Sequence, residues 1–165
     1  MAGMNQMIKN DFLAWLKWRL RNMPYKVREA VVRYKKVKDV IETVTSPEDV
    51  WRFFSKRVKG ETREVFYCLY LSQRNGVLCF EEVSVGISTG TVIDVKGIVR
   101  AAILVGAETL IFIHNHPSGD PEPSQGDIDV TKKLVEACRI FDLEVLDHII
   151  VGDKGFSSLK GMREL

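Results

Sequence analysis

The chain has 165 residues, of which 45% are hydrophobic and 28% are charged, and its formal net charge is +2. These values are typical of a globular domain with a short appendage, long enough to bury a core. No apolar run approaches the roughly 18 residues that a membrane-spanning helix requires, and charged residues interrupt every apolar stretch near the N-terminus. We therefore expect a cytoplasmic protein with neither a membrane span nor a secretory signal.

The charge is distributed unevenly along the chain. Residues 1–45 contain ten Lys and Arg against four Asp and Glu, a net charge of +6, whereas residues 46–165 contain fourteen against eighteen, a net charge of −4. A basic segment of this kind can contact nucleic acid or an acidic partner, or it can simply be solvated. We predict a basic, helical N-terminal extension over 1–45 and a separate domain over 46–165.

Two helices are predicted in the extension. Apolar residues recur at helical spacing between residues 10 and 22, with basic residues around them, and Pro24 ends this segment. We expect a docking helix with a solvated basic side, although packing on a second copy or on a partner fits the same pattern. Residues 25–44 give an ambiguous pattern, for which we favour a second helix.

The domain is predicted to begin with a helix and a β-hairpin. Ser46-Pro47-Glu48-Asp49 combines a capping serine, a proline at the first helical position and an acidic residue three positions after the cap, and Gly60 ends the helix. Strands over 65–71 and 77–80 flank the Asn75-Gly76 pair, which suits a tight turn.

The rest of the domain mixes strands with helices. A strand is expected near 91–95, a helix over 97–105, an apolar strand over 109–113, a helix over about 124–140 and a last strand over 143–151. Strands and helices mixed along a chain of this length predict an α/β sandwich.

The three cysteines, Cys68, Cys79 and Cys138, lie in apolar contexts and form no Cys-x-x-Cys pair. We expect buried thiols in a reducing compartment. A cysteine nucleophile is a disfavoured alternative, because no cysteine lies beside a histidine in the sequence.

Residues 111–127 carry the strongest chemical signal. Side chains alternate along an extended chain, so His114 and His116 are expected to project from the same face at the end of the 109–113 strand. Asp127 follows His116 by eleven residues and lies in the first turn of the next helix. Two imidazole nitrogens and one carboxylate leave the fourth tetrahedral position open, which is the pattern of a catalytic rather than a structural zinc. The Pro- and Gly-rich loop between them is expected to hold the ligands in place.

Structural explanations of these residues compete with the metal site. Ser124-Gln125-Gly126-Asp127 is also a capping-box sequence, so Asp127 could serve only the helix start. A His-x-His pair on a loop is most often polar surface, and His148, in a strand pattern, is expected to be buried and hydrogen-bonded. The chain has only three histidines, however, and two of them lie together where an apolar strand ends.

A family resemblance favours the metal site. The pattern His114-x-His116-Pro117, six residues, then Ser124-x-x-Asp127 resembles the JAMM (MPN+) metalloprotease motif. The full string from His114 to Asp127 resembles the RadC branch of these proteins in particular, as does Asp147-His148-Ile149-Ile150-Val151-Gly152.

The resemblance extends from about Ser46 to Leu165 and implies both a fold and a cofactor. The fold is a cytidine-deaminase-like three-layer α/β sandwich, a mixed β-sheet with helices on both sides. The cofactor is one Zn²⁺ per chain, held by His114, His116 and Asp127.

The implied activity is hydrolysis of a peptide or isopeptide amide in a substrate that the sequence does not identify. Zinc lowers the pKa of bound water to about 7, and a carboxylate must then accept a proton. In JAMM enzymes this base is a Glu beside the first strand, and Arg63-Glu64-Val65-Phe66 matches the Arg-Glu-x-Phe of the RadC pattern. We predict Glu64 as this base, with Glu82 and Glu61 as alternatives. Ser124 is predicted to cap the helix and, like the family's serine, to donate a hydrogen bond to the developing oxyanion.

The chain departs from the RadC pattern in two places. RadC proteins carry a helix-hairpin-helix region before the domain, and residues 1–45 do not resemble it, so a nucleic-acid contact cannot be carried over. The His-Pro-Arg-Glu often found before the middle helix reads Ile93-Asp94-Val95-Lys96 here, which puts in doubt any substrate or partner contact made there.

Two other function classes compete with a hydrolase. A DNA-associated repair or recombination factor with no proteolytic role is the main alternative, supported by the basic segment 1–45 and by the label that RadC proteins traditionally bear. Phosphate binding would show as a steep salt dependence. A scaffold whose metal is structural or lost is disfavoured, because all three ligands are present.

Overall fold

The computed structural model describes residues 41–85 and 93–165, together with residues 12, 14, 15, 17, 18, 35 and 37. The chain divides into two units, residues 1–35 and residues 36–165, and the candidate site lies in the second. The described residues of the predicted 10–22 helix are helical, and the rest of that segment lies outside the described residues. Among the helices that the structure describes, none combines the length and the apolar character needed to cross a bilayer.

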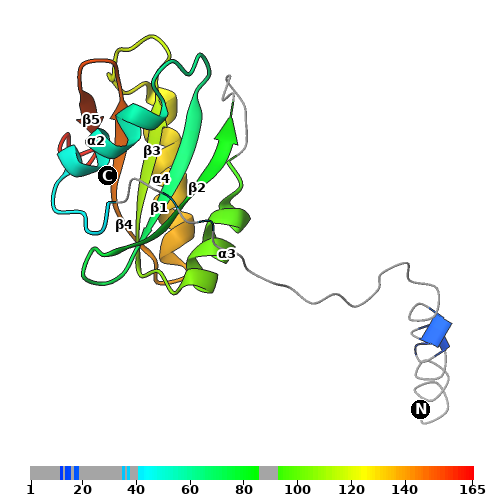
Figure 1. Cartoon of the computed structure of the whole chain (residues 1–165). Helices are drawn as coiled ribbons and strands as arrows, with labels where there is room; N and C mark the ends of the chain where they lie inside the picture. Colours follow the sequence, from blue (N-terminus) through cyan, green and yellow to red (C-terminus); the bar gives the residue numbers. More distant parts are fainter. Residues whose placement is uncertain are drawn as a thin grey trace. The chain divides into compact units, whose positions relative to one another are not determined.

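The elements of the second unit form one sheet and three helices in its described part. In chain order they are α2 (Pro47–Arg57), β1 (Val65–Leu71), β2 (Val77–Val85), α3 (Val95–Val105), β3 (Thr109–Asn115), α4 (Gln125–Arg139), β4 (Glu144–Val151) and β5 (Phe156–Ser158). The strand order is β2-β1-β3-β4-β5 (Figure 1). β3 and β4 run parallel and the other neighbouring strands run antiparallel, so the sheet is mixed, as predicted.

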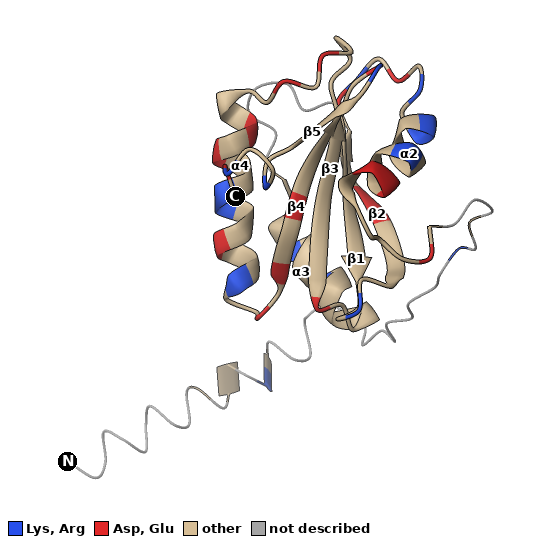
Figure 2. Ribbon diagram, turned by 90° about the vertical axis from the view of Figure 1, so that its left-hand side faces the viewer, with Lys and Arg blue, Asp and Glu red and all other residues tan. Residues whose placement is uncertain are grey.

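Helices cover both faces of this sheet. Figure 2 shows the sheet between α4 on one side and α2 on the other. Every residue of β1 is buried, and alternate residues of β1 belong to two different apolar clusters, one beneath α2 and one beneath α3 and α4. A strand buried on both faces needs a layer on each side. The predicted three-layer α/β sandwich is confirmed.

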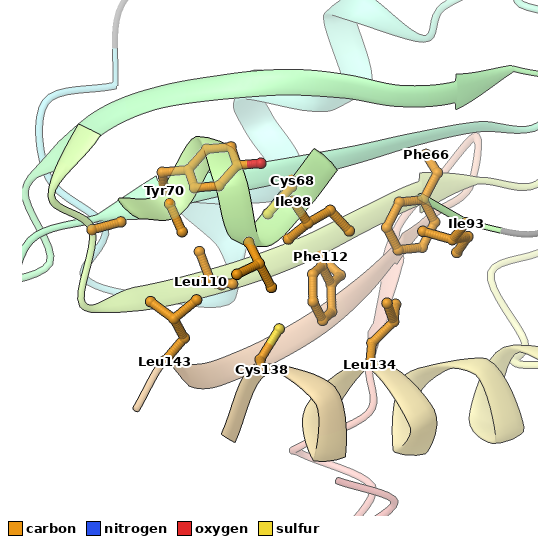
Figure 3. Packing of buried hydrophobic residues seen from close by; sticks show 13 residues of the cluster. Phe66, Cys68, Tyr70, Ile93, Ile98, Leu110, Phe112, Leu134, Cys138 and Leu143 are labelled. Carbon is orange, nitrogen blue, oxygen red and sulfur yellow. The ribbon is translucent and has the colours of Figure 1, made fainter. Parts of the chain in front are cut away.

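The cluster beneath α3 and α4 fixes the orientation of α4. Figure 3 shows Leu134 and Cys138 of α4 directed toward Phe112 of β3. Thr131, Leu134 and Cys138 are the buried residues of α4, and their spacing places them on one face of the helix. Asp127 lies four residues before Thr131, at the N-terminal end of that same face.

In the domain, two predictions of secondary structure are wrong or incomplete, and one strand was not predicted. The strand expected near 91–95 is not present in residues 93–95: Asp94 accepts a hydrogen bond from the Gly97 N–H at 3.0 Å and so caps α3, which begins at Val95. β2 continues five residues beyond the predicted 77–80, because an edge strand tolerates polar residues. β5, which the sequence did not predict, pairs with the end of β4.

The second helix expected over 25–44 is not helical at its described residues, Lys35, Val37 and 41–44. Residues 43 and 44 instead extend alongside the hairpin turn: Thr43 forms a bridge with Gly76, and the Val44 N–H donates to the Asn75 carbonyl at 3.0 Å. The remainder of that segment lies outside the described residues.

Candidate metal centre

His114, His116 and Asp127 meet at the C-terminal end of β3. Nε2 of His114 lies 3.0 Å from Nε2 of His116 and 3.3 Å from Oδ1 of Asp127, and Nε2 of His116 lies 3.4 Å from Oδ2 of Asp127. Ligands about 2.1 Å from a tetrahedral zinc ion are separated from one another by about 3.4 Å. The donor atoms and their spacing therefore fit a zinc ion.

The strand places both histidines on the α4 side of the sheet. His114 alternates with Leu110 and Phe112, which face the cluster beneath α3 and α4. The His116 N–H donates to the Val151 carbonyl of β4 at 3.1 Å, so the extended chain continues past the end of β3. Side-chain alternation then returns His116 to the face that His114 occupies.

Asp127 serves the helix start and faces the histidines at the same time. The Ser124 N–H and hydroxyl donate to Oδ2 of Asp127 at 2.8 and 2.6 Å, and the Asp127 N–H donates to the Ser124 hydroxyl oxygen at 3.2 Å. This capping box fixes the carboxylate and leaves Oδ1 directed at His114. The capping interpretation and the metal-ligand interpretation of Asp127 are thus compatible.

The electrostatics of the site favour a cation. Burial raises the pKa of the Asp127 carboxyl, but hydrogen bonds from His114, His116 and Ser124 more than offset it and hold the pKa far below its usual value. Asp127 is therefore ionised. The hydrogen bond with Asp127 raises the pKa of His116 against the effect of burial, and the charge of Glu64 adds to the increase.

The loop over 117–123 is fixed to the end of β4 by two glycines. Gly119 has φ +79°, and its carbonyl accepts a hydrogen bond from the Asp153 N–H at 2.9 Å. A Cβ atom on Gly152 would lie 2.5 Å from that carbonyl oxygen, so the close approach requires glycine. The Asp120 carbonyl of the same loop lies 2.8 Å from Nδ1 of His116 and orients its ring.

A sequence model of the RadC-like JAB domain matches residues 44–164. This chain belongs to the RadC-like JAB domain family. The UPF0758 proteins of Bacillus cereus (strain AH187) and Bacillus anthracis (strain A0248) are 42% identical to it over 118 residues, and that of Methanosarcina acetivorans is 40% identical over 117 residues. These alignments cover 71–72% of this chain and 51–52% of the relatives, so the chain spans about half the length of the curated relatives it matches.

The family resemblance seen in the sequence is thereby confirmed, whereas the boundary between 45 and 46 and the roles of the site residues stay predictions. Among these residues, Glu64 is half-buried and immediately precedes β1. The Asn115 side chain bonds to the backbone on both sides of Glu64: its Oδ1 accepts from the Val65 N–H at 2.8 Å, and its Nδ2 donates to the Arg63 carbonyl at 3.0 Å. The residue between the two histidines therefore holds the backbone of the predicted base.

The two alternative bases have other partners. Glu61 forms an ion pair with Arg63 at 3.2 Å. Glu82 lies opposite Tyr67 on the neighbouring strand, and the Tyr67 hydroxyl is 3.5 Å from the Glu82 carboxylate. Tyr67 belongs to the cluster beneath α2, on the other face of the sheet from His114. This arrangement favours Glu64 among the three.

The cysteines do not support the alternative of a thiolate nucleophile. All three are free, and burial raises the pKa of Cys79 and of Cys138 to about 11 and that of Cys68 well above its usual value. A nucleophilic cysteine needs a lowered pKa. The thiols therefore remain protonated near neutral pH.

Sequence reasoning assigned no part in the metal site to three buried polar residues around the ligands, Asn115, Thr131 and His148. His148 was expected to be buried and hydrogen-bonded, and this is confirmed: it is 1% exposed and bonds to His114 and Thr131. Burial lowers its pKa well below the usual value, so the ring is neutral. The four-residue spacing between Asp127 and Thr131 was the available signal, because it places both on one helix face.

Proposed function

We propose that this chain is a zinc-dependent hydrolase of peptide or isopeptide amide bonds. The observation that carries the proposal is the meeting of His114, His116 and Asp127, whose ligand atoms all lie within 4.8 Å of one another. Three protein ligands and one open position are typical of catalytic zinc sites. Membership of the RadC-like JAB domain family supports the proposal.

The residues of the site divide the reaction between them. His114, His116 and Asp127 would hold the ion. When bound, zinc supplies a Lewis acid for the substrate carbonyl and makes a water molecule nucleophilic near neutral pH. The Glu64 carboxylate would accept a proton from the attacking water and deliver it to the leaving nitrogen, so that an amide and water yield a carboxylic acid and an amine.

Ser124 has two candidate roles that one substitution separates. Its hydroxyl carries a single hydrogen, which is donated to Asp127 in this structure and must be released before it can reach an oxyanion. Loss of about 10²–10³ in kcat for Ser124→Ala would support the oxyanion role. A change of about 1 kcal/mol in unfolding free energy, with kcat nearly unchanged, would leave capping as its role.

Zinc content and isotope incorporation together test the function. The protein purified without added zinc should contain about one zinc ion per chain, and His116→Ala should lose it. The zinc-loaded protein is then incubated with a peptide and isopeptide mixture in ¹⁸O-labelled water, because hydrolysis of any amide places ¹⁸O in the new carboxylate. Mass spectrometry should detect labelled products for wild type but not for His116→Ala or Glu64→Gln. Labelling by the wild-type protein that is no greater than labelling by Glu64→Gln would overturn the proposal.

The alternative of a DNA-associated factor depends on the basic segment 1–45. Most of that segment lies outside the described residues, so the structure adds no observation in its favour. DNA binding that weakens steeply with salt and disappears when residues 1–45 are deleted would revive it.

A further inference from the structure

A line of buried hydrogen bonds runs from His114 into the core and back to Asp127. Nδ1 of His114 lies 2.8 Å from Nε2 of His148 on β4, and Nδ1 of His148 lies 2.5 Å from the hydroxyl oxygen of Thr131 on α4. That hydroxyl oxygen lies 2.6 Å from the backbone carbonyl oxygen of Asp127. His148 and Thr131 are 1% and 0% exposed, so water does not compete for these bonds.

The hydrogens along this line can be placed in only one order. A carbonyl oxygen carries no hydrogen, so the single hydroxyl hydrogen of Thr131 must lie on the short contact with Asp127. The Thr131 oxygen then accepts from His148, which must carry its hydrogen on Nδ1. A His148 ring that carries its one hydrogen on Nδ1 accepts at Nε2, so His114 donates to it from its own Nδ1. With Nδ1 of His114 engaged in this bond, Nε2 is the nitrogen available to a metal ion, on the side of Asp127.

We propose that His148 and Thr131 are positioning residues that hold His114 in the tautomer able to bind a metal ion through Nε2. The second nitrogen of a ligand histidine usually donates to a carboxylate, a backbone carbonyl or water, and this bond sets tautomer and ring orientation. Here the acceptor is another histidine, which is fixed in turn by a threonine. The inference rests on the metal-binding part of the proposed function and does not require hydrolysis.

Aromatic packing fixes the His148 ring independently of any metal ion. Phe66 of β1 and Phe112 of β3 both meet this ring edge to face, with centroid separations of 5.3 and 6.0 Å. The orientation of His148 is therefore a property of the folded sheet. The tautomer of His114 is set before metal binds, which spares the ion the cost of reorganising its ligand.

Nitrogen NMR of the imidazole rings in the zinc-free protein observes the tautomers directly, since the chain has only three histidines. We expect the hydrogen on Nδ1 in both His114 and His148. Thr131→Val keeps the shape of the side chain but removes the hydroxyl, so His148 should shift toward the Nε2–H form and His114 with it. A wild-type protein in which either ring carries its hydrogen on Nε2 alone would overturn the proposal.

Zinc affinity, measured by competition with a chromophoric chelator, tests the consequence. Thr131→Val should weaken zinc binding by about 10–100-fold, the usual effect of removing a hydrogen-bond partner behind a metal ligand. Thr131→Ser restores the hydroxyl and should return the affinity close to wild type. Thr109→Val is the matched control: Thr109 is a buried threonine of β3 whose hydroxyl has no hydrogen-bond partner within the described part of the chain. This variant should bind zinc like the wild type.

The outcomes separate this inference from the proposed function. Equal zinc affinities for wild type, Thr131→Val and Thr109→Val, all shown to be folded by thermal unfolding, would overturn the positioning role and leave the hydrolase proposal intact. A wild-type protein without affinity for zinc would overturn the proposed function itself. If Thr131→Val does not fold, the tautomers of the wild-type rings still decide the question.

Discussion

Helices α2 and α4 begin with the same local pattern, a serine followed three residues later by an aspartate. In α2, Oδ2 of Asp49 accepts from the Ser46 N–H at 3.0 Å and from the Thr45 hydroxyl at 2.6 Å. In α4, Oδ2 of Asp127 accepts from both the N–H and the hydroxyl of Ser124, and the carboxylate also faces two histidines. The short-range sequence thus explains the cap in both helices, and the candidate function of Asp127 arises from the strand that the fold places opposite it.

The largest expected difference between the two caps is in zinc binding. Asp127→Ala removes an anionic ligand and should weaken zinc affinity by more than about 100-fold, because even the loss of an outer hydrogen-bond partner costs about 10–100-fold. Asp49→Ala disrupts the cap of α2, which covers the other face of the sheet from the histidines, and should bind zinc like the wild type. Chelator competition on both variants makes the measurement. Equal affinities would show that the histidines and Asp127 do not act together.

A second prediction concerns Glu64, which immediately precedes β1 and whose charge raises the pKa of His116. Glu64→Gln should retain zinc but lower kcat by about 10²–10⁴, the usual contribution of a general base. Glu82→Gln is the control, since Glu82 lies opposite Tyr67 and should turn over like the wild type. The rate of ¹⁸O incorporation into a substrate found in the labelling experiment provides the measurement. Loss of turnover in Glu82→Gln alone would move the base to the other face of the sheet.

The elements next to the site were predictable because their signals are local. The strand over 109–113 is a run of apolar residues, and the start of the helix over 124–140 is marked by the capping-box residues Ser124 and Asp127. The strand expected near 91–95 is absent from its described residues, 93–95, because the Asp94 side chain caps the start of α3 in a segment rich in β-branched residues. β5 could not be predicted, since it depends on pairing with β4.

The residues of the candidate site likewise divide into those with a local sequence signal and those that only tertiary contacts identify. His114, His116 and Asp127 were recognised from their spacing and from the family motif, all within fourteen residues of one another. The residues that hold the rest of the site in place have distant partners: Asn115, beside Glu64, bonds to a residue 50 positions away, and His148, behind His114, bonds to residues 34 and 17 positions away. Only the tertiary fold reveals such contacts, because no short-range pattern encodes them.

The third prediction tests how the fold positions Glu64. Asn115→Ala removes both hydrogen bonds that flank Glu64 and should lower kcat by up to about 100-fold, since a displacement of about 1 Å can have that effect. Zinc affinity should change little, because both of these hydrogen bonds join Asn115 to the backbone beside Glu64 and neither involves a ligand nitrogen. The double variant Glu64→Gln/Asn115→Ala should be no slower than Glu64→Gln, which steady-state kinetics can measure. Additive losses would instead show that Asn115 acts through something other than Glu64.

The smallest expected effect is on the stability contributed by the α2 cap. Asp49→Ala should lower the unfolding free energy by about 0.3–1.5 kcal/mol, as usual for the loss of a capping interaction. Hydrogen bonds from Thr45 lower the pKa of Asp49 in the folded protein, and burial opposes them only weakly. The stabilisation is therefore fully present above the unfolded-state pKa of about 3.9 and is lost as the pH falls through the lower folded-state pKa.

The two curves of unfolding free energy against pH, for wild type and Asp49→Ala, should consequently converge below about pH 4. Urea titrations at a series of pH values measure this convergence. Asp49→Asn is the matched control: its amide oxygen still accepts a hydrogen bond but does not titrate, so it should lose less stability near neutral pH. A gap between wild type and Asp49→Ala that stays constant into strong acid would mean that the carboxylate charge does not stabilise the α2 cap.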